Sequence, residues 1–373
     1  MNNPLNIDVK TILFPKKAII GVDVGSYALK FVTLEEEKKE LKLKDWGYVP
    51  LDFPPDINSE EKPIFISEEI KRYLKKKGLP FKFAATSISG NSVIVRYVKF
   101  PKLSRKEMEL TLGVEAEPFI PFDINDVNLT YFPLGDVNEE GQAKMESVLI
   151  AAKKELIDDR LNILTDAGLE PIIIDVDAFV LENLYAWLYP DFGESTILVL
   201  NIGNKVSNLS IISQGVTRVV RDIFIAGTSF DRAIAKVTGT EIKAAPELKK
   251  HYGLFLTTEE KEKAIMDYNK EALAISKACF GIMKNLCNEI SRSIDYYLSQ
   301  GGDQSISKIF LSGGMANFGN ISQYLSGEFR VPVEIANPLS KFGQQAKNIP
   351  PDILPAMNIA TGLALRKIKD WEE

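Results

Sequence analysis

A repeated hairpin motif constrains the fold of this chain more than any other feature. Residues 19–34 read IIGVDVGSYALKFVTL and residues 197–212 read ILVLNIGNKVSNLSII. In both copies an apolar run, an acid or its amide, a β-branched residue and a glycine precede a second, partly apolar run. Each copy predicts two strands joined by a tight turn, and the alternating stretch 41–49 adds a third strand to the first hairpin. The repeat therefore predicts two related halves.

The segments around the hairpins predict helices packed on sheets. After the first hairpin, a helix over 67–77 begins with Ser67 as its N-cap and ends at Gly78. A later buried strand is followed by a helix over 178–188, which begins after Asp177. The alternation of strand and helix is typical of α/β packing.

The second half is predicted to follow the same plan. A helix opens at Thr228, with Asp231 completing a capping box. Charged helical segments fill 241–300, a strand covers 308–312, and a final helix covers 355–369. The chain thus reads as two α/β halves with insertions.

Residues 80–152 look like a unit of their own. Ser104 and Glu107 form a capping box at the start of a helix, and the region of Gly141 is a hairpin loop. The expected module is one helix on a four-stranded sheet, with strands at 83–89, 92–99, 127–134 and 146–152.

Composition excludes several classes of function. The formal net charge is −6 and the 45 Lys and Arg are scattered, so nucleic acid is a poor partner. Cys279 and Cys287 lie too far apart along a predicted helix for a disulfide, which indicates reduced thiols. His251 has no cluster of metal ligands around it, which argues against a zinc site or a His-dependent triad.

The sequence also predicts a cytoplasmic protein. It contains no uninterrupted apolar stretch of membrane-spanning length, and the N-terminal segment MNNPLNIDVKTILFPKK lacks the apolar core of a secretory signal. Attachment to a membrane would then have to go through a partner.

The turns of the two hairpins suit phosphate binding. Asp23 ends a buried strand and can hold a divalent cation or its waters, while the backbone amides of Gly25 and Ser26 can cradle anionic oxygens. A single motif of this kind is more often a plain hairpin whose Asp hydrogen-bonds its own turn. Two copies favour a shared ligand.

A third segment, IFLSGGMANFGNISQYL at 309–325, supports the same ligand. A buried strand ends at Ser312, and Gly313 and Gly314 let the backbone approach a flat group before the next helix. A nucleotide would place its phosphates between the two hairpins and its adenosine on this turn.

These segments carry a family resemblance. IIGVDVGSYALKFV, ILVLNIGNKVSNLSI and IFLSGGMANF resemble the phosphate-1, phosphate-2 and adenosine motifs of the actin-like ATPase superfamily. The block 93–135, RDIFIAGTSFDRAIAK at 221–236, and the ending EIANPLS…MNIATGLALRKI resemble the PilM family of type IV pilus assembly proteins. The resemblance extends over 17–371, and the block 93–135 is its most specific part.

The resemblance implies an α/β, actin-like (ribonuclease H-like) fold of two halves with an FtsA-type inserted α+β subdomain. The expected boundaries are 1–79 for the first part of subdomain 1A, 80–152 for the inserted subdomain 1C, 153–194 for the rest of 1A, 195–236 for the first part of 2A, 237–300 for 2B, 301–350 for the rest of 2A, and 351–373 for a C-terminal helix that returns to 1A.

The resemblance also implies a cofactor and partners. Such proteins bind ATP with Mg²⁺ between their halves and work on the cytoplasmic face of the inner membrane, peripheral to it. They capture the cytoplasmic N-terminal peptide of the membrane protein PilN, in a groove that involves the inserted subdomain, and assemble with other pilus platform proteins. Neither nucleic acid nor direct membrane contact is expected.

The residues expected at the nucleotide fall into three groups. Phosphates are assigned to Gly25, Ser26, Lys30, Gly203 and Asn204. Adenosine is assigned to Gly313, Gly314 and Met315, with Glu247 and Lys250 added by analogy of position. The cation is assigned to Asp23 and, through water, to Asn201.

Asn201 departs from the superfamily pattern, which has an acidic residue at the second hairpin. An amide accepts a hydrogen bond from water but neither takes its proton nor matches a carboxylate's attraction for Mg²⁺. The sequence therefore predicts retained ATP binding with slow or absent hydrolysis, and leaves the catalytic residues unknown. The alternative is neutral drift at a turn that accepts either residue.

Three other functions share this architecture. An FtsA-like cell-division anchor would end in a membrane-binding amphipathic helix, whereas this chain ends soon after GLALRKIKDWEE. A small-molecule kinase would need a general-base carboxylate beside a second substrate, for which there is no motif. A nucleotide-free scaffold like the secretion protein GspL is disfavoured by the residues Gly25, Ser26, Gly313 and Gly314.

Overall fold

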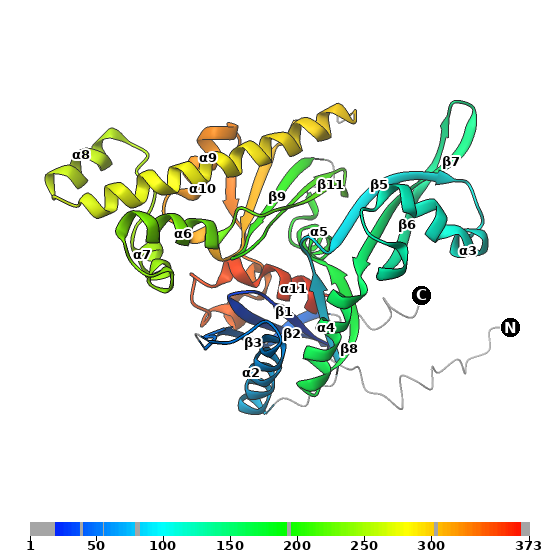
Figure 1. Ribbon diagram of the computed structural model, residues 1–373, viewed down its shortest axis with the longest axis horizontal. Helices are drawn as coiled ribbons and strands as arrows, with labels where there is room; N and C mark the ends of the chain where they lie inside the picture. Colours follow the sequence, from blue (N-terminus) through cyan, green and yellow to red (C-terminus); the bar gives the residue numbers. More distant parts are fainter. Residues whose placement is uncertain are drawn as a thin grey trace.

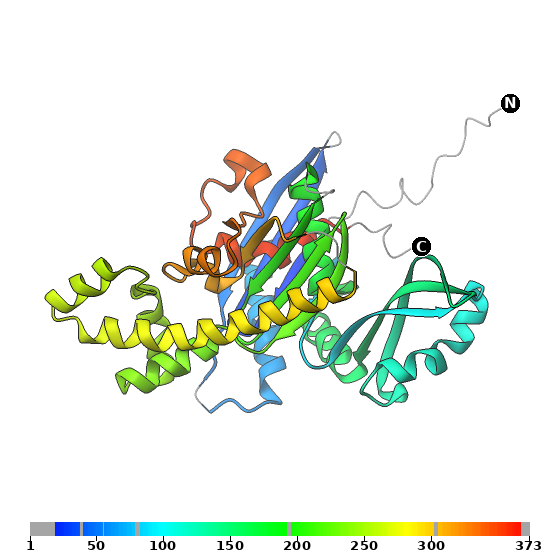
Figure 2. The same ribbon diagram turned by 90° about the horizontal axis from the view of Figure 1, so that it is seen from above.

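The structure is a computed structural model that describes residues 19–37, 40–54, 56–78, 83–191, 195–301 and 305–366. In these ranges the chain forms two five-stranded sheets and one three-stranded sheet. Helices cover the sheets, and the three-stranded sheet stands to one side at one end of the molecule (Figure 1). Seen from above, the long helix α9 (Lys270–Ser299) crosses the second half (Figure 2).

The sheet of the first half has the strand order β3-β2-β1-β4-β8. The first three strands pair antiparallel as the predicted meander, while β4 and β8 add in parallel. The strands are β1 (Ile19–Val24), β2 (Ala28–Glu37), β3 (Glu40–Pro50), β4 (Phe83–Ile88) and β8 (Glu170–Val176).

The sheet of the second half has the order β11-β10-β9-β12-β13, with the same pattern of antiparallel and parallel pairs. The prediction of two related halves is confirmed. The strands are β9 (Thr196–Ile202), β10 (Ser207–Ser213), β11 (Val216–Ile223), β12 (Lys308–Ser312) and β13 (Val333–Ile335).

The helices pack on and between the two large sheets. The first half carries α2 (Glu61–Lys77), α4 (Lys154–Asp166), α5 (Asp177–Leu188) and α11 (Asn358–Ala364). The second half carries α6 (Gly227–Thr238), α7 (Ala245–His251), α8 (Thr258–Met266), α9 and α10 (Ile321–Phe329).

Helix α11 lies unusually close to strand β1. A Cβ atom on Gly21 would stand 2.3 Å from the carbonyl oxygen of Ala360, so no larger residue fits there. Leu363 of α11 belongs to a core cluster that also contains Val199 and Phe310 of the second sheet. The C-terminal helix therefore joins the cores of the two halves.

The inserted unit holds β5 (Val93–Pro101), α3 (Arg105–Ala116), β6 (Val127–Glu139) and β7 (Gln142–Lys153). The predicted four-stranded sheet is wrong, because the sheet has three strands in the order β5-β7-β6. The remaining predicted strand, 83–89, is β4 and belongs to the sheet of the first half. It pairs with β1 and β8, and all six of its residues are buried. Its apolar run specifies a strand but not its neighbours.

The local signals of the inserted unit are confirmed. The side chain of Ser104 accepts a hydrogen bond from the amide of Glu107, and the Glu107 carboxylate accepts one from the amide of Ser104. Gly141 has a φ of 82° in the turn between β6 and β7.

Two predicted helix starts are wrong. Helix α2 begins at Glu61, so Ser67 lies inside it, buried, and donates to the carbonyl of Ile64. Pro63 in the first turn is compatible with this earlier start, because that turn needs no amide donor there. The predicted end is confirmed, since Gly78 is a left-handed C-cap.

Helix α6 begins at Gly227, one residue before the predicted Thr228 cap. Thr228 instead donates to the carbonyl of Asn204 from both its amide and its hydroxyl, each at 2.8 Å. The predicted final helix shortens to α11, preceded by a 3₁₀ turn at Leu354–Met357. The last positions predicted for it, 367–369, lie outside the described residues.

None of the helices in the described ranges combines the length and apolar composition needed to cross a bilayer. Cys279 and Cys287 are free, buried thiols on α9, as predicted. Burial raises the pKa of each to about 12, so both remain protonated.

Candidate functional site

A cleft of about 500 Å³ lies between the two halves. It is lined by both hairpin turns, the end of β4, the start of α5, part of α7 and the turn after β12. Among the predicted site residues, only Gly313 and Glu247 are not part of its lining. The tertiary structure thus brings the three sequence motifs to one place.

The first hairpin contributes an ion pair to the cleft. Asp23 on β1 and Lys30 on β2 face each other across the ladder, and the Lys30 Nζ lies 2.9 Å from the Asp23 Oδ2. The two side chains are 16% and 14% exposed. The residues predicted for the cation and for a phosphate therefore neutralise each other in this structure.

Gly25 leaves no room for a side chain. An added Cβ would stand 2.5 Å from the Lys30 Nζ and 2.9 Å from the carbonyl oxygen of Ala28. Because the second contact is with backbone, it could not relax by a change of rotamer. The turn therefore lines the cleft with no side chain at position 25.

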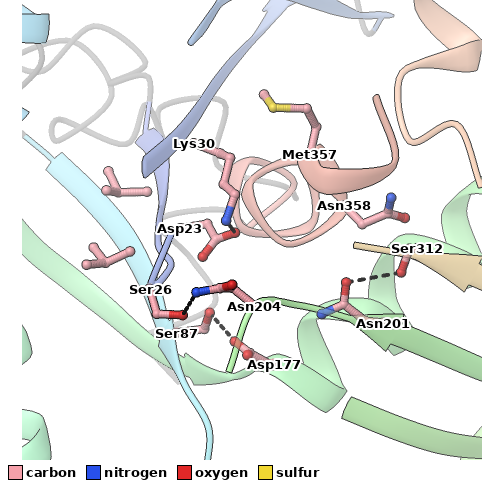
Figure 3. A network of polar contacts seen from close by, with 12 residues as sticks. Asp23, Ser26, Lys30, Ser87, Asp177, Asn201, Asn204, Ser312, Met357 and Asn358 are labelled. Atoms are coloured by element: carbon pink, nitrogen blue, oxygen red, sulfur yellow. Dashed lines mark hydrogen bonds and ion pairs between the residues drawn. The ribbon is translucent and has the colours of Figure 1, made fainter. Parts of the chain in front are cut away.

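The second hairpin carries amides where the first carries charges. Asn201 on β9 faces Asn208 on β10, and its Nδ2 donates to the Asn208 Oδ1 at 2.9 Å. Its Oδ1 accepts a hydrogen bond from the Ser312 hydroxyl at 3.2 Å. In Figure 3, Asp23 and Lys30 point toward each other, and so do Asn201 and Ser312. The predicted role of Asn201 as a holder of metal-bound water remains a prediction.

The two turns meet at equivalent positions. The Asn204 Nδ2 of the second turn donates to the Ser26 Oγ of the first at 3.5 Å (Figure 3). Each residue directly follows the glycine of its own motif. The contact therefore joins corresponding positions of the two repeats at the cleft.

The sequence indicated no site role for Asp177, which is the first residue of α5 and lines the cleft. The Ser87 hydroxyl at the end of β4 donates to its Oδ1 at 2.6 Å. Burial, and then the nearby charge of Asp23, raise the pKa of Asp177 to about 6. A signal existed, because Asp177, like Asp23, follows a buried strand.

Arg160 was missed as well, and no sequence signal distinguishes it. It lies within α4, lines the cleft, and donates to the carbonyl of Val24 at 3.1 Å. Burial lowers its pKa, and the carboxylates of Asp177 and Asp23 oppose that shift. It adds a positive charge beneath the first hairpin.

Helix α7 contributes two lysines to the cleft, the expected Lys250 and also Lys249, which the sequence did not indicate. Lys249 lines the cleft and its Nζ lies 2.7 Å from the Oδ1 of Asp231, which is buried on α6. Lys250 also lines the cleft but pairs with the exposed Glu247 at 2.7 Å. Glu247 itself does not line the cleft.

The turn after β12, which is predicted to contact adenosine, packs against β9. Gly313 has a φ of 88°, and a Cβ on it would stand 2.3 Å from the carbonyl oxygen of Ile202. Gly313 thus holds the turn against β9, while Gly314 and the buried Met315 line the cleft.

The carboxylates of the cleft suit a cation only together with a ligand. Within the described ranges there is no group of three His, Cys, Asp or Glu side chains that could hold a metal ion. Mg²⁺ in proteins is usually held by one or two carboxylates, waters and substrate phosphates. Asp23 fits that pattern with a phosphate between the turns.

The chain is similar to known proteins over most of its length. The family model described as "Type IV pilus assembly protein PilM" matches residues 21–368. A solved "PilM-PilN type IV pilus biogenesis complex" is 26% identical, with a TM-score of 0.77, covering 94% of this chain and 99% of that one.

Two more distant structures share the fold alone. The ethanolamine utilization protein EutJ from Carboxydothermus hydrogenoformans is 13% identical, with a TM-score of 0.54 and coverage of 94% and 90%. MreB 5 of Spiroplasma citri bound to AMPPNP is 14% identical, with a TM-score of 0.51 and coverage of 93% and 94%. The predicted actin-like fold of two halves is confirmed.

Proposed function

The chain belongs to the PilM family of type IV pilus assembly proteins, and we propose that it is a nucleotide-binding scaffold of the pilus assembly platform. The observation that carries the proposal is the meeting of Ser26 and Asn204 across a cleft lined by all three motifs. The scaffold works on the cytoplasmic face of the inner membrane.

ATP occupies the cleft with its phosphates between the two turns. The amides of Gly25 and Ser26 on one side, and those of Gly203 and Asn204 on the other, donate to phosphate oxygens. Lys30 moves its charge from Asp23 to a phosphate, which frees Asp23 to hold Mg²⁺ or its waters. Met315 and Gly314 form the wall for adenosine, with Lys250 at its edge.

Hydrolysis is slow or absent. A water that attacks a phosphate needs a group that orients it and takes its proton. Asn201 cannot take a proton, and both ends of its amide are already hydrogen-bonded. Asp177 is the carboxylate placed for this role, since its pKa of about 6 suits proton transfer near neutral pH. The cleft thus has one carboxylate suited to proton transfer, Asp177. The superfamily pattern has an additional acid at the second hairpin, where this protein has Asn201, and this difference supports weak ATP hydrolysis.

The protein partner is the cytoplasmic N-terminal peptide of a PilN-like membrane protein. The matched structure is a PilM-PilN complex, and it covers 94% of this chain. The peptide binds in a groove that involves the inserted unit, and it is the scaffold's link to the membrane and to the other platform proteins. Bound ATP sets the closure of the two halves, because its phosphates contact a turn from each.

Equilibrium binding of a fluorescent ATP analogue, with and without Mg²⁺, tests this function. We expect saturable binding that Mg²⁺ strengthens and unlabelled ATP displaces. A PilN-type peptide should bind with a different affinity when the nucleotide is present. Absence of nucleotide binding would refute the proposal and favour a nucleotide-free scaffold, and equal peptide affinity in both states would refute the coupling alone.

A further inference from the structure

A chain of side-chain hydrogen bonds runs from the wall of the cleft to the base of the inserted unit. The Ser312 hydroxyl donates to Asn201, and Asn201 donates to Asn208. The Asn208 Nδ2 then donates to the Asp222 Oδ1 at 2.8 Å. Finally, the Asp222 Oδ2 accepts a hydrogen bond from the backbone amide of Gly90. Four strands of the second half and the turn after β4 are connected in this way.

This series of hydrogen bonds ends at the neck of the inserted unit, which we define as the turn around Gly90 and the facing end of β7 at Lys153. Gly90 lies between β4 and β5, and its carbonyl accepts the amide of Val93, the first residue of β5. On the returning strand, the Lys153 amide donates to the carbonyl of Ser92. Asp222 belongs to the second half, so this contact links that half directly to the neck.

The direction of the hydrogen bonds in this series explains why position 201 holds an amide. Asp222 accepts at both of its oxygens, which turns the Asn208 nitrogen toward Asp222 and the Asn208 oxygen toward Asn201. Residue 201 must then supply a donor. Asparagine has one and an ionised aspartate has none. Since Ser312, Asn201 and Asn208 all donate toward Asp222, these three bonds also polarise one another.

We propose that Asn201 and Asp222 are positioning residues that carry the state of the cleft to the neck of the inserted unit. The inference rests on the proposed nucleotide binding. A nucleotide on the turn after β12 shifts Ser312, which immediately precedes that turn, and the shift changes how firmly Asp222 holds the Gly90 amide. Asp222 does not line the cleft, so it takes part in this transfer without touching the ligand.

Hydrogen exchange of the segment 88–93 tests the transfer, measured by mass spectrometry on the full chain with and without saturating AMPPNP and Mg²⁺. In the parent we expect AMPPNP to change exchange at the neck about tenfold, the size of one hydrogen bond to a charged acceptor. In Asp222→Asn the change is lost, because an amide offers only one oxygen for two donors. The affinity for the fluorescent ATP analogue should stay within about twofold of the parent, since Asp222 makes no direct ligand contact.

Asp136→Asn is the matched control, because Asp136 is an exposed carboxylate on β6 that pairs with Lys102 outside the chain of hydrogen bonds. It should behave as the parent. Asn201→Asp provides a second variant should Asp222→Asn not fold, and it too should lose the nucleotide-dependent change.

The outcomes separate the two claims. Parent protein that fails to bind the analogue overturns the proposed function and this inference together. Binding without any change at 88–93, or a change that persists in Asp222→Asn, overturns the inference alone. A purely structural role for Asp222 would speed exchange equally in both states and leave their ratio intact, which also overturns it.

Discussion

The two hairpins of this protein share one backbone design and differ in the chemistry of their facing positions. In the first sheet the facing side chains form an ion pair, and in the second they form an amide pair that ends on a carboxylate. The equivalent positions along the three strands are Asp23, Lys30 and Tyr48 in the first sheet, and Asn201, Asn208 and Asp222 in the second.

The two hairpins therefore keep the same backbone geometry while the chemistry of their side chains differs. An ion pair can exchange partners when a charged ligand arrives, because its lysine can turn to a phosphate. An amide chain is already satisfied and has little to gain from such a ligand. The facing side chains of the first hairpin are therefore suited to binding nucleotide, and those of the second hairpin to reporting its presence. Four predictions test that division.

The largest effect is expected from filling the first turn. Gly25→Val would press a side chain against the Ala28 carbonyl and displace the amides that face the phosphates. We expect affinity for the fluorescent ATP analogue to fall about a hundredfold, the loss of one or two charge-assisted hydrogen bonds. Gly135→Val is the control, since a Cβ there meets open space. Undiminished binding would show that the first turn does not hold the phosphates.

Restoring the acid tests the second hairpin. Asn201→Asp adds a group that attracts Mg²⁺ and takes a proton, so we expect ATP turnover to rise about tenfold or more. Release of phosphate at saturating ATP measures the effect, with the exposed Asn138→Asp as a control of equal charge. Rapid hydrolysis by the parent would contradict the assigned effect of Asn201.

Removing the charge of the first hairpin should have a smaller effect on binding. Lys30→Met leaves Asp23 without its partner and a phosphate without a cation, so we expect about tenfold weaker binding with a shallower salt dependence. Lys42→Met, which breaks an exposed pair with Glu37, controls for the loss of one lysine. Equal salt dependence in parent and variant would mean that Lys30 stays with Asp23.

The smallest effect concerns Asp177, beside the charged hairpin. Its pKa of about 6 in the folded state lies above the ordinary 3.8, so between these values the folded state binds more protons than the unfolded state. The parent should therefore lose stability relative to Asp177→Asn as the pH rises from 4 to 7. Urea unfolding of both proteins at several pH values measures this difference. If the stability difference between the two proteins did not vary with pH, the Asp177 carboxyl would be exposed to water and not buried.

Much of the fold could be predicted from local signals. The hairpins, the cap at Ser104 and the stop at Gly78 each depend on residues a few positions apart. The predictions that were wrong depend on distant partners. Thr228 has the chemistry of a helix cap, but the turn at Asn204 takes its hydroxyl. The strand at 83–88 was found, yet its place in the first sheet depends on β1 and β8.

The site shows the same division. The glycines of the two hairpins, Asp23 and Asn201 could be predicted as site residues because the same motif occurs twice in the sequence. Lys249 and Arg160 were not, because one pairs with Asp231 of another helix and the other reaches the Val24 carbonyl from far along the chain.

Short patterns of side chains were enough to predict that this protein has two related halves. The same patterns predicted a glycine turn after a buried strand in each half. Only the tertiary structure decided that Asp23 pairs with Lys30, that Asp177 enters the cleft, and that Asn201 donates toward Asp222. These outcomes depend on strand register and on groups brought together from distant segments. The direction of these hydrogen bonds is set by Asp222, an acceptor that the fold brings close to Asn208. It is not set by the residues next to Asn201 in the sequence.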